Sequence, residues 1–236
     1  MNLTDNLDII RYSDGKIEEV SDLMVNETTL LVVVNNEYKK ELLCSPAELY
    51  ELALGYLKTQ GYILNISDVE SLTIKGEDSF TAEITLNDKT STDIRNNLEQ
   101  TNQVNFETDV ILQNLNRFYE ESTLQKATAG VHRCALCNND GIILSCDDIS
   151  RHCAFDKIIG HAVKEGIELS DKYVITSGRV PLDMIKKVDT CGIPMIVSRT
   201  APTISAAYFA RDKGITLLGF SREKRFNVYS NFSRII

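Results

Sequence analysis

The chain has 236 residues, of which 43% are hydrophobic, and this is enough for one large or two small packed cores. No stretch approaches the roughly 18 apolar residues of a membrane span, and the polar, acidic start MNLTDNLDII is unlike a signal peptide. The formal net charge of −9 disfavours general binding to nucleic acid. We therefore expect a cytoplasmic protein that binds neither membranes nor nucleic acid, in which any anion site is a local patch.

The first third of the sequence is rich in β-strand patterns. Asn35-Asn36 predicts a hairpin turn between two of the strands. Residues 87–107 are polar and lack periodicity, which is typical of a connection. We expect an N-terminal β-rich (α+β) subdomain over 1–106, with strands over 30–34, 37–44, 71–75 and 80–86.

One helix is well marked within this subdomain. Ser45-Pro46-Ala47-Glu48 has the pattern of a capping box with proline at the first helical position. Gly61 is expected to end the helix. The apolar residues that recur at helical spacing between these signals are Leu49, Leu52, Ala53, Tyr56 and Leu57.

The second half alternates between helix and strand patterns. A helix is predicted over 108–124, with Val110, Leu112, Leu115 and Phe118 facing inward. Later helices are indicated by the apolar face Phe155, Ile158, Ile159, Ala162 and Val163, by Pro181, and by Ala206, Ala207 and Ala210. A short element is expected over 131–136, followed by a turn at 138–141, and strands are expected over 142–146, 173–176, 194–198, 215–219 and 226–229. This alternation predicts a layered α/β domain over 107–236.

Basic residues follow three of the predicted strands. In open α/β sheets, ligands bind beyond the carboxyl ends of the strands. Two of the loops lead into helix N-termini, whose free amides favour anions, and guanidinium groups bind phosphate through paired hydrogen bonds. The loops therefore predict a phosphate or pyrophosphate site formed by Arg179, Arg199, Arg222, Lys224 and Arg225. The alternative interpretation is that these are solvated loop charges.

A polar cluster precedes the third predicted helix. Asp147 or Asp148 is placed to accept a hydrogen bond from His152 or to pair with Arg151. The alternative interpretation is that Asp148 or Ser150 caps the helix.

The six cysteines include a Cys-x-x-Cys pair, Cys134 and Cys137. Such a pair suggests zinc, redox exchange or a persulfide, and His132 with Cys146 or Cys153 would complete a zinc site. The alternative interpretation is that the cysteines are small apolar residues that pack on a short helix. Because no export signal is evident, we expect reduced thiols.

Several segments in this order resemble the FdhD/NarQ family of formate dehydrogenase accessory sulfurtransferases. Ala129 stands at the first glycine of the family's Gly-Gly-x-His stretch, and Cys153 stands at the asparagine of its Arg-His-Asn-Ala-x-Asp-Lys motif. The matching segments cover nearly the whole chain outside the polar connection. They are 44–46, 61–63, 129–132, 147–160, 176–179, 201–203 and 219–229.

The resemblance implies a cytidine-deaminase-like α/β fold without the deaminase zinc, usually as a homodimer, and no permanent metal. It implies transfer of sulfur from a cysteine desulfurase to the bis-molybdopterin guanine dinucleotide cofactor of molybdenum or tungsten, before insertion into the formate dehydrogenase catalytic subunit. The cofactor-binding residues that follow are Phe220, Ser221, Arg222, Glu223, Lys224, Arg225, Arg179, Ser177, His132, Arg151 and His152.

The chain departs from the family at the sulfur-carrying loop. Members usually have Cys-Gly-x-Cys-Gly where this chain has residues near 101–106, and the interval 87–126 contains no cysteine. Cys134 and Cys137 are the best substitutes as catalytic thiols, with Cys153 next. The alternative hypothesis is a non-catalytic chaperone that only binds the cofactor. A zinc hydrolase of the deaminase type is disfavoured, because the residue two after His132 is Cys134 rather than glutamate.

Overall fold

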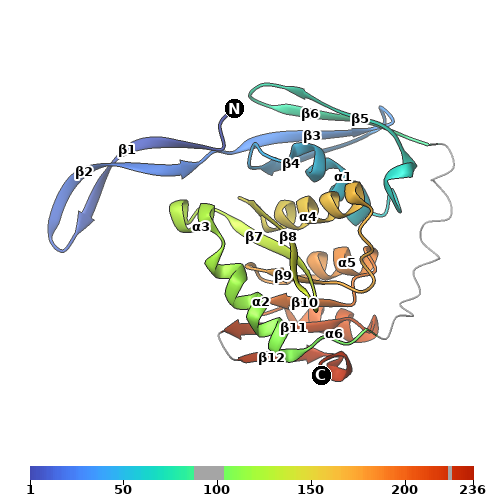
Figure 1. The fold of residues 1–236 in the computed structure, drawn as a ribbon. Coiled ribbons are helices and arrows are strands. Elements are labelled where there is room, and N and C mark those ends of the chain that lie inside the picture. Colours follow the sequence, from blue (N-terminus) through green and yellow to red (C-terminus); the bar gives the residue numbers. More distant parts are fainter. Residues whose placement is uncertain (88–103, 223–224) are drawn as a thin grey trace.

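The computed structural model describes residues 1–87, 104–222 and 225–236. The described elements form a mixed α/β structure with two larger sheets and a separate hairpin (Figure 1). The four-stranded sheet has the order β4-β3-β6-β5, in which β3 and β6 are parallel and the other pairs are antiparallel. Its strands are β3 (Thr28–Val34), β4 (Tyr38–Cys44), β5 (Val69–Gly76) and β6 (Phe80–Leu86), with the short helix η1 (Ile66–Asp68) before β5.

The six-stranded sheet has the order β12-β11-β10-β9-β7-β8. Its central strands β9, β10 and β11 are parallel, whereas β7 is antiparallel to β9 and β12 is antiparallel to β11. The three parallel strands therefore end on the same side of the sheet. The strands are β7 (His132–Asn138), β8 (Gly141–Asp148), β9 (Tyr173–Thr176), β10 (Met195–Ser198), β11 (Thr216–Arg222) and β12 (Arg225–Ser230), and η4 (Phe232–Arg234) follows.

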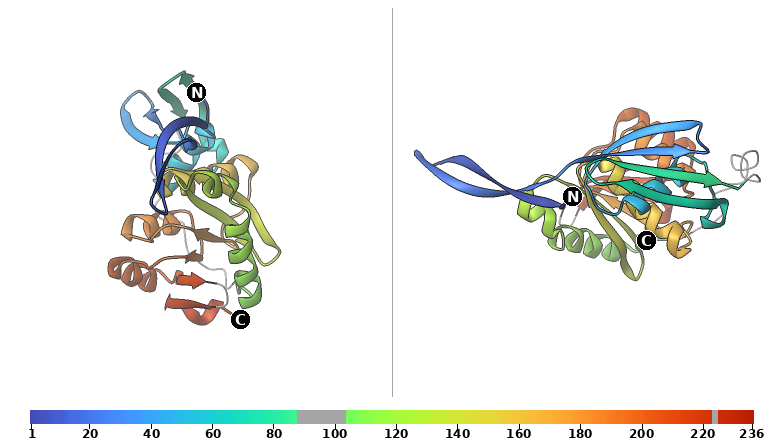
Figure 2. Two further views of the ribbon diagram at one scale, coloured as in Figure 1. Left: turned by 90° about the vertical axis from the view of Figure 1, so that its left-hand side faces the viewer. Right: turned by 90° about the horizontal axis from the view of Figure 1, so that it is seen from above.

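Helices cover both faces of the six-stranded sheet. On one face, a core lies under α4 (Arg151–Glu165), α5 (Leu182–Thr190) and α6 (Ile204–Asp212), and it continues through α1 (Leu49–Thr59) into the four-stranded sheet. On the other face, a second core lies under α2 (Thr108–Glu120), which is followed by α3 (Thr123–Thr128). Figure 2 shows α2 and the pair α5 and α6 on opposite sides of the sheet. No helix within the described ranges is long and apolar enough to cross a membrane.

Helices α1 and α4 touch through backbone at two glycines. A Cβ atom on Gly55 would lie 1.7 Å from the Asp156 carbonyl oxygen, and one on Gly160 would lie 1.8 Å from that of Glu51. Glycine is therefore required at both positions for this approach. The shared core crosses the predicted boundary between 1–106 and 107–236, and Phe106 itself is fully buried in the core under α2.

The predicted strands and helices are found with small shifts at their ends, with three exceptions. The short helix suggested for Cys134 and Cys137 is wrong, because both residues lie on the strand β7. The capping box is wrong, because α1 begins at Leu49 and its N-cap residue, Glu48, has φ 54° and makes no side-chain cap. The predicted helix over 108–124 is two helices, and on α2 it is Ile111 and Asn114, rather than Val110 and Leu112, that are fully buried. The Asn35-Asn36 hairpin is confirmed, with positive φ at both residues.

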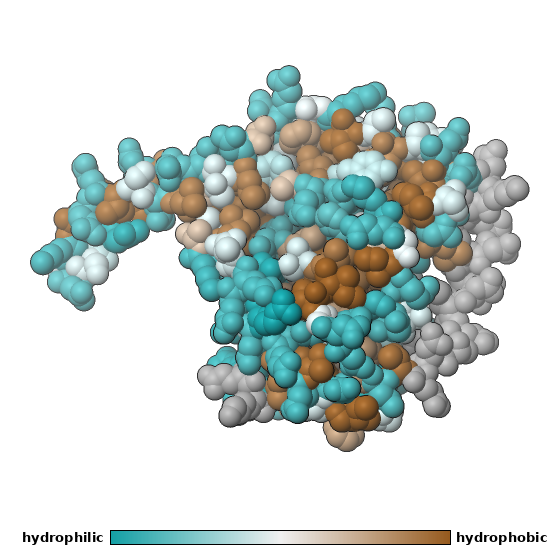
Figure 3. All heavy atoms as spheres, in the orientation of Figure 1, coloured by the Kyte–Doolittle hydropathy of each residue, from teal (hydrophilic) through white to brown (hydrophobic). Residues whose placement is uncertain are grey.

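The first 25 residues form an arm that no sequence pattern predicted. Strands β1 (Thr4–Ser13) and β2 (Lys16–Val25) pair only with each other and project from the body (Figures 1 and 2). The arm exposes the large side chains of Leu7, Ile10, Tyr12, Ile17 and Met24. Brown, apolar atoms lie at the surface of the arm in Figure 3. A two-stranded hairpin alone is only marginally stable in water, so we expect another surface to pack against the arm.

Candidate functional site

The ends of the three parallel strands are joined by hydrogen bonds into a continuous edge. The amide of Arg199 donates to the Thr176 carbonyl at 3.3 Å, and the amide of Phe220 donates to the Thr200 carbonyl at 3.1 Å. The three predicted loops therefore meet, as the ends of parallel strands should. We call this edge the rim and define it as residues 177–181, 199–203 and 219–222.

Two of the rim arginines surround a tyrosine that the sequence did not single out. The Arg199 guanidinium lies 4.6 Å from the centre of the Tyr119 ring on α2. Burial raises the pKa of Tyr119 to about 12, against the opposing effect of the Arg199 and Arg222 charges, so both cations lie near its hydroxyl. Arg225 faces Arg222 across the β11–β12 pair, and all three arginines are exposed. No sequence pattern distinguishes Tyr119 from an inward-facing core residue of a helix.

The other predicted basic residues are less closely joined to this group. Arg179 is exposed on the first loop of the rim, and its side chain makes no ion pair with any of the described residues. Glu223 and Lys224 lie outside the described residues.

His132, Ser177 and Arg151 come together at the end of β9. The His132 Nδ1 and Ser177 Oγ atoms are 3.3 Å apart, and Ser177 Oγ also accepts a hydrogen bond from the Arg133 amide at 3.0 Å. Arg151 packs so closely on Gly178 that a Cβ atom there would lie 2.9 Å from Arg151 Cδ. Burial, followed by the Arg151 charge, lowers the pKa of His132, so its imidazole is neutral near pH 7.

One buried polar atom beside Gly178 of the rim, Arg151 Nε, has no hydrogen-bond partner within the described part of the chain. The buried Tyr119 hydroxyl, in contrast, has Ser221 as its hydrogen-bond neighbour, and the Ser221 hydroxyl donates to the Ser198 carbonyl at 2.8 Å. Buried polar groups are normally paired, because an unpaired one costs about 1–3 kcal/mol. A hydrogen-bond acceptor that reaches Arg151, such as a phosphate oxygen, would satisfy this nitrogen.

The structure places His152 away from the rim. Its Nε2 lies 3.3 Å from Asp183 Oδ2, and burial, followed by the Lys187 charge, lowers its pKa. His152 lines a groove of about 810 Å³ between β4 and helices α4 and α5, and the described lining of this groove contains no rim residue. Cys153 lines the same groove, but only 3% of its surface is exposed.

Cys134 and Cys137 do not form a working pair. They lie three residues apart on β7, so their side chains point to opposite faces of the sheet, Cys134 into the core under α4 and Cys137 into the core under α2. The interpretation of this segment as a two-cysteine redox or zinc pair is therefore wrong. Cys134 is the thiol nearest the rim, and its Sγ–H donates to Thr176 Oγ1 at 3.4 Å.

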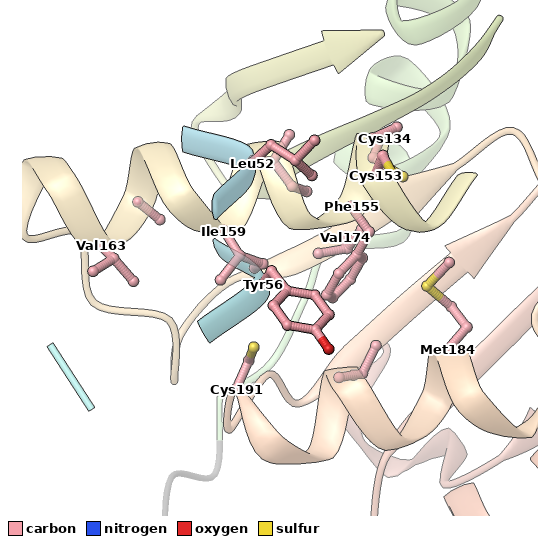
Figure 4. Close-up of a cluster of buried hydrophobic side chains, with 14 of the residues drawn as sticks. Leu52, Tyr56, Cys134, Cys153, Phe155, Ile159, Val163, Val174, Met184 and Cys191 are labelled. Carbon is pink, nitrogen blue, oxygen red and sulfur yellow. The ribbon is translucent and has the colours of Figure 1, made fainter. Parts of the chain in front are cut away.

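All six cysteines lie within the described ranges, and all are reduced and buried. Figure 4 shows Cys134, Cys153 and Cys191 packed among apolar side chains. Burial raises the pKa of Cys134 to about 12 and raises that of Cys137 further. Because the thiolate is the reactive form, no cysteine of this conformation is prepared for nucleophilic attack.

The acidic residues of the family-like motif have structural partners. Asp148 Oδ2 lies 2.7 Å from Lys157 Nζ with both side chains fully buried, and it also accepts hydrogen bonds from the Ser45 amide and hydroxyl. Asp147 pairs with Arg133 at 3.1 Å. The predicted pairing of these aspartates with Arg151 or His152 is therefore wrong, because Asp148 pairs with Lys157 and Asp147 pairs with Arg133. Asp148 does accept the Ser150 amide at 2.9 Å, just before α4.

A second buried pair links the same helix to α5 and α1. Asp156 lies 2.6 Å from Lys187 Nζ and accepts the Thr59 hydroxyl at 2.8 Å. The motif residues Asp156 and Lys157 thus fix α4 to α1, α5 and the segment after β4. Sequence reasoning missed Ser45, Thr59 and Lys187 as their partners, because the pairs join positions far apart in the chain.

Comparisons with known proteins agree with one another. A model of the FdhD/NarQ family matches residues 25–104 and 83–236. The chain is 31% identical to the sulfur carrier protein FdhD of Listeria innocua, with 100% of both chains covered, and 30% identical to that of Bacillus subtilis, with 97% of this chain and 96% of the relative covered. A crystal structure from Desulfotalea psychrophila, described as a candidate formate dehydrogenase accessory protein, has a TM-score of 0.85 and 25% identity with both chains fully covered.

Proposed function

The chain belongs to the FdhD/NarQ family, and from this premise we propose that it serves formate dehydrogenase by binding the bis-molybdopterin guanine dinucleotide cofactor of molybdenum or tungsten on the rim. The observation that carries this proposal is the grouping of Arg199, Arg222 and Arg225 around a strand edge in a protein of net charge −9. The cofactor contains pyrophosphates, and exposed guanidinium groups recognise phosphate oxygens in pairs.

Phe220 adds a second reason to place the cofactor on the rim. Its φ of 50° is in the left-handed region, which is costly for a bulky residue, and 43% of its side chain surface is exposed. Strained residues cluster at ligand sites, where the surrounding structure holds them in place. An exposed aromatic ring next to Ser221 and Arg222 is suited to stack on a guanine base.

The finer step in this proposal is the transfer of sulfur from a cysteine desulfurase to the bound cofactor. Cys134 is the preferred carrier because its hydrogen-bond partner, Thr176, directly precedes the rim. To act, it must become exposed and ionised, which requires local opening at the end of β9.

The second candidate function is binding and presentation of the cofactor without sulfur transfer. The observation that favours it is the burial of every cysteine of the chain. In that case the chain has lost the sulfur chemistry that its relatives' name describes, together with the two cysteines expected near 101–106.

Three expectations accompany either function. The exposed apolar arm favours a homodimer, because a second copy is a surface always available to cover it. The client is the formate dehydrogenase catalytic subunit, and the compartment is the cytoplasm. We also propose that the fold is similar to that of cytidine deaminases, which is supported by the layer formed by α4, α5 and α6 on the central sheet.

Intact-protein mass spectrometry separates the two functions. The protein is incubated with a cysteine desulfurase and cysteine, then measured with and without a reductant. Sulfur transfer predicts a reversible gain of one sulfur atom that is lost in Cys134→Ala and retained in the control Cys191→Ala, which removes a buried cysteine elsewhere in the core. An unmodified wild-type chain leaves the binding function alone.

A further inference from the structure

Three side chains from separate parts of the chain meet at the outer edge of the six-stranded sheet. Glu48 Oε1 lies 2.9 Å from His161 Nε2, and the Cys146 thiol donates to the same oxygen at 3.6 Å. All three ligand atoms lie within 4.8 Å of one another. From this cluster we infer a binding site for a zinc-class divalent cation, with Glu48, Cys146 and His161 as its protein ligands.

The residue types suit this class of metal. Zn²⁺ takes thiolate sulfur at about 2.3 Å, imidazole nitrogen at about 2.0 Å and carboxylate oxygen at about 2.0–2.2 Å. Bound at these lengths in a tetrahedron, the three atoms would lie about 3.3–3.6 Å apart. The Glu48 oxygen is now 2.9 Å from the His161 nitrogen and 3.6 Å from the Cys146 sulfur, so only small side-chain movements are needed for these two pairs. A thiolate and a carboxylate together balance a double positive charge, and the cation takes the place of the thiol proton. Hard cations such as Mg²⁺ prefer all-oxygen ligands and are disfavoured here.

Each ligand comes from a rigid position. Cys146 lies on the edge strand β8, His161 lies in the middle of α4, and Glu48 immediately precedes α1. Because α1 and α4 meet backbone to backbone at Gly55 and Gly160, the spacing between these two ligands is fixed. Sites on helices and strands hold their geometry better than sites on loops.

Glu48 is free to act as a ligand because it does not cap the helix. The sequence pattern assigned it to a capping box with Ser45, but its side chain makes no cap and is directed to Cys146 and His161 instead. Ser45 is engaged by Asp148 and Lys157. The cluster is therefore not a by-product of helix capping.

The cluster is open to solvent on one side. The side chains of Glu48 and His161 are 36% and 23% exposed, whereas only 4% of the Cys146 surface is exposed. A cation can thus enter from solvent, with the sulfur behind it and a water in the fourth position. Sites that keep three protein ligands and one open position are typical of reactive zinc rather than structural zinc.

The site is separate from the rim and does not rest on the proposed function. Strand β8 is the edge strand of the sheet, with β7 between it and the first parallel strand, β9. The zinc sets considered from the sequence used Cys134 with Cys137, which the structure separates. The ligand set in the structure joins residues 98 and 113 positions apart, which local spacing does not reveal.

Titration with Co²⁺ tests the site on the full chain after removal of metals by a chelator. We expect a stoichiometric thiolate-to-cobalt charge-transfer band in the near ultraviolet, displaced by Zn²⁺. The band should disappear in Cys146→Ala and persist in the control Cys153→Ala, which removes a similarly buried cysteine that is outside the cluster. Absence of the band in the wild type, or its persistence in Cys146→Ala, would overturn the proposal.

Two further variants keep the test decisive if Cys146→Ala does not fold. Glu48→Gln and His161→Gln retain the thiol, and each should weaken Co²⁺ binding by more than roughly tenfold. Circular dichroism of the metal-free variants checks that the fold is retained. Unchanged affinity in both folded variants would likewise overturn the proposal.

Discussion

The charged residues under α4 and those on the rim have opposite environments. Lys157 and Asp148 are fully buried and bonded to each other, whereas Arg199 and Arg222 are exposed around a tyrosine hydroxyl. A buried charge must be paired to be tolerated, but an exposed one is available to a ligand. The residues that resemble the family therefore have two different roles. Asp156 and Lys157 stabilise the fold, and the rim arginines are available to bind a ligand.

The largest loss of stability is expected from removing a buried charge. Lys157→Met leaves Asp148 buried without its cation, and we expect the free energy of unfolding to fall by about 3–5 kcal/mol. Urea denaturation followed by circular dichroism measures the loss. The matched control is Lys164→Met on the same helix, where the lysine is 50% exposed and pairs with Glu51, so the loss should be clearly smaller than in Lys157→Met. Equal losses in the two variants would contradict the distinction.

Removing a rim charge should affect binding and leave stability unchanged. Arg222→Ala and Arg225→Ala should each weaken the binding of GDP by roughly tenfold, because each removes a charge-assisted hydrogen bond to phosphate. Isothermal calorimetry measures the affinity, and thermal melting should show no shift. Arg211→Ala is the control, since Arg211 is an exposed arginine at the far end of α6. GDP affinity that is the same in all variants would remove the rim from the proposed site.

The smallest effect on stability is expected from His132 and His152, which are neither fully buried nor fully exposed. Burial lowers the pKa of His132 and His152 below the usual value near 6.5, so the unfolded chain binds protons that the folded chain does not. Their contribution to stability is therefore complete above about pH 6.5 and is lost as the pH falls toward the folded pKa. Thermal melting between about pH 7.5 and pH 5.5 measures this loss.

The variants His132→Gln and His152→Gln isolate the imidazoles in this measurement. Asp147, whose pKa is raised by burial, titrates equally in wild type and variants and so cancels from the difference. A melting temperature that depends on pH as steeply in both variants as in the wild type would show that these histidines are not the source.

Much of the fold could be predicted from the sequence because its helices and strands are marked by local patterns. The apolar face from Phe155 to Val163 on α4 is fully buried, and β9 has the predicted bounds, Tyr173 to Thr176. The arm escaped prediction because its apolar residues alternate on both faces with charges and have no core to face. The capping box failed because Ser45 has a stronger partner in Asp148, more than a hundred residues away.

The sequence could predict which loops meet at the candidate site, but not how their side chains are arranged. Parallel strands must end together, so the meeting of the three rim loops follows from the order of strands and helices. The orientation of side chains does not follow, so the sequence did not show that Tyr119 lies beside Arg199 or that His152 lies beside Asp183. The cysteine pair failed for a different reason, since Cys-x-x-Cys brings two thiols together in a loop or helix turn but turns them apart on a strand such as β7.

The glycine contact between α1 and α4 limits how the protein can rearrange around a ligand. Shear between packed helices normally proceeds by small sliding movements of interlocked side chains. At Gly55 and Gly160 there is no side chain to slide, because each Cα rests directly on the backbone of the other helix. The two helices must swing as one rigid body, so any hinge that admits a large cofactor lies elsewhere in the chain.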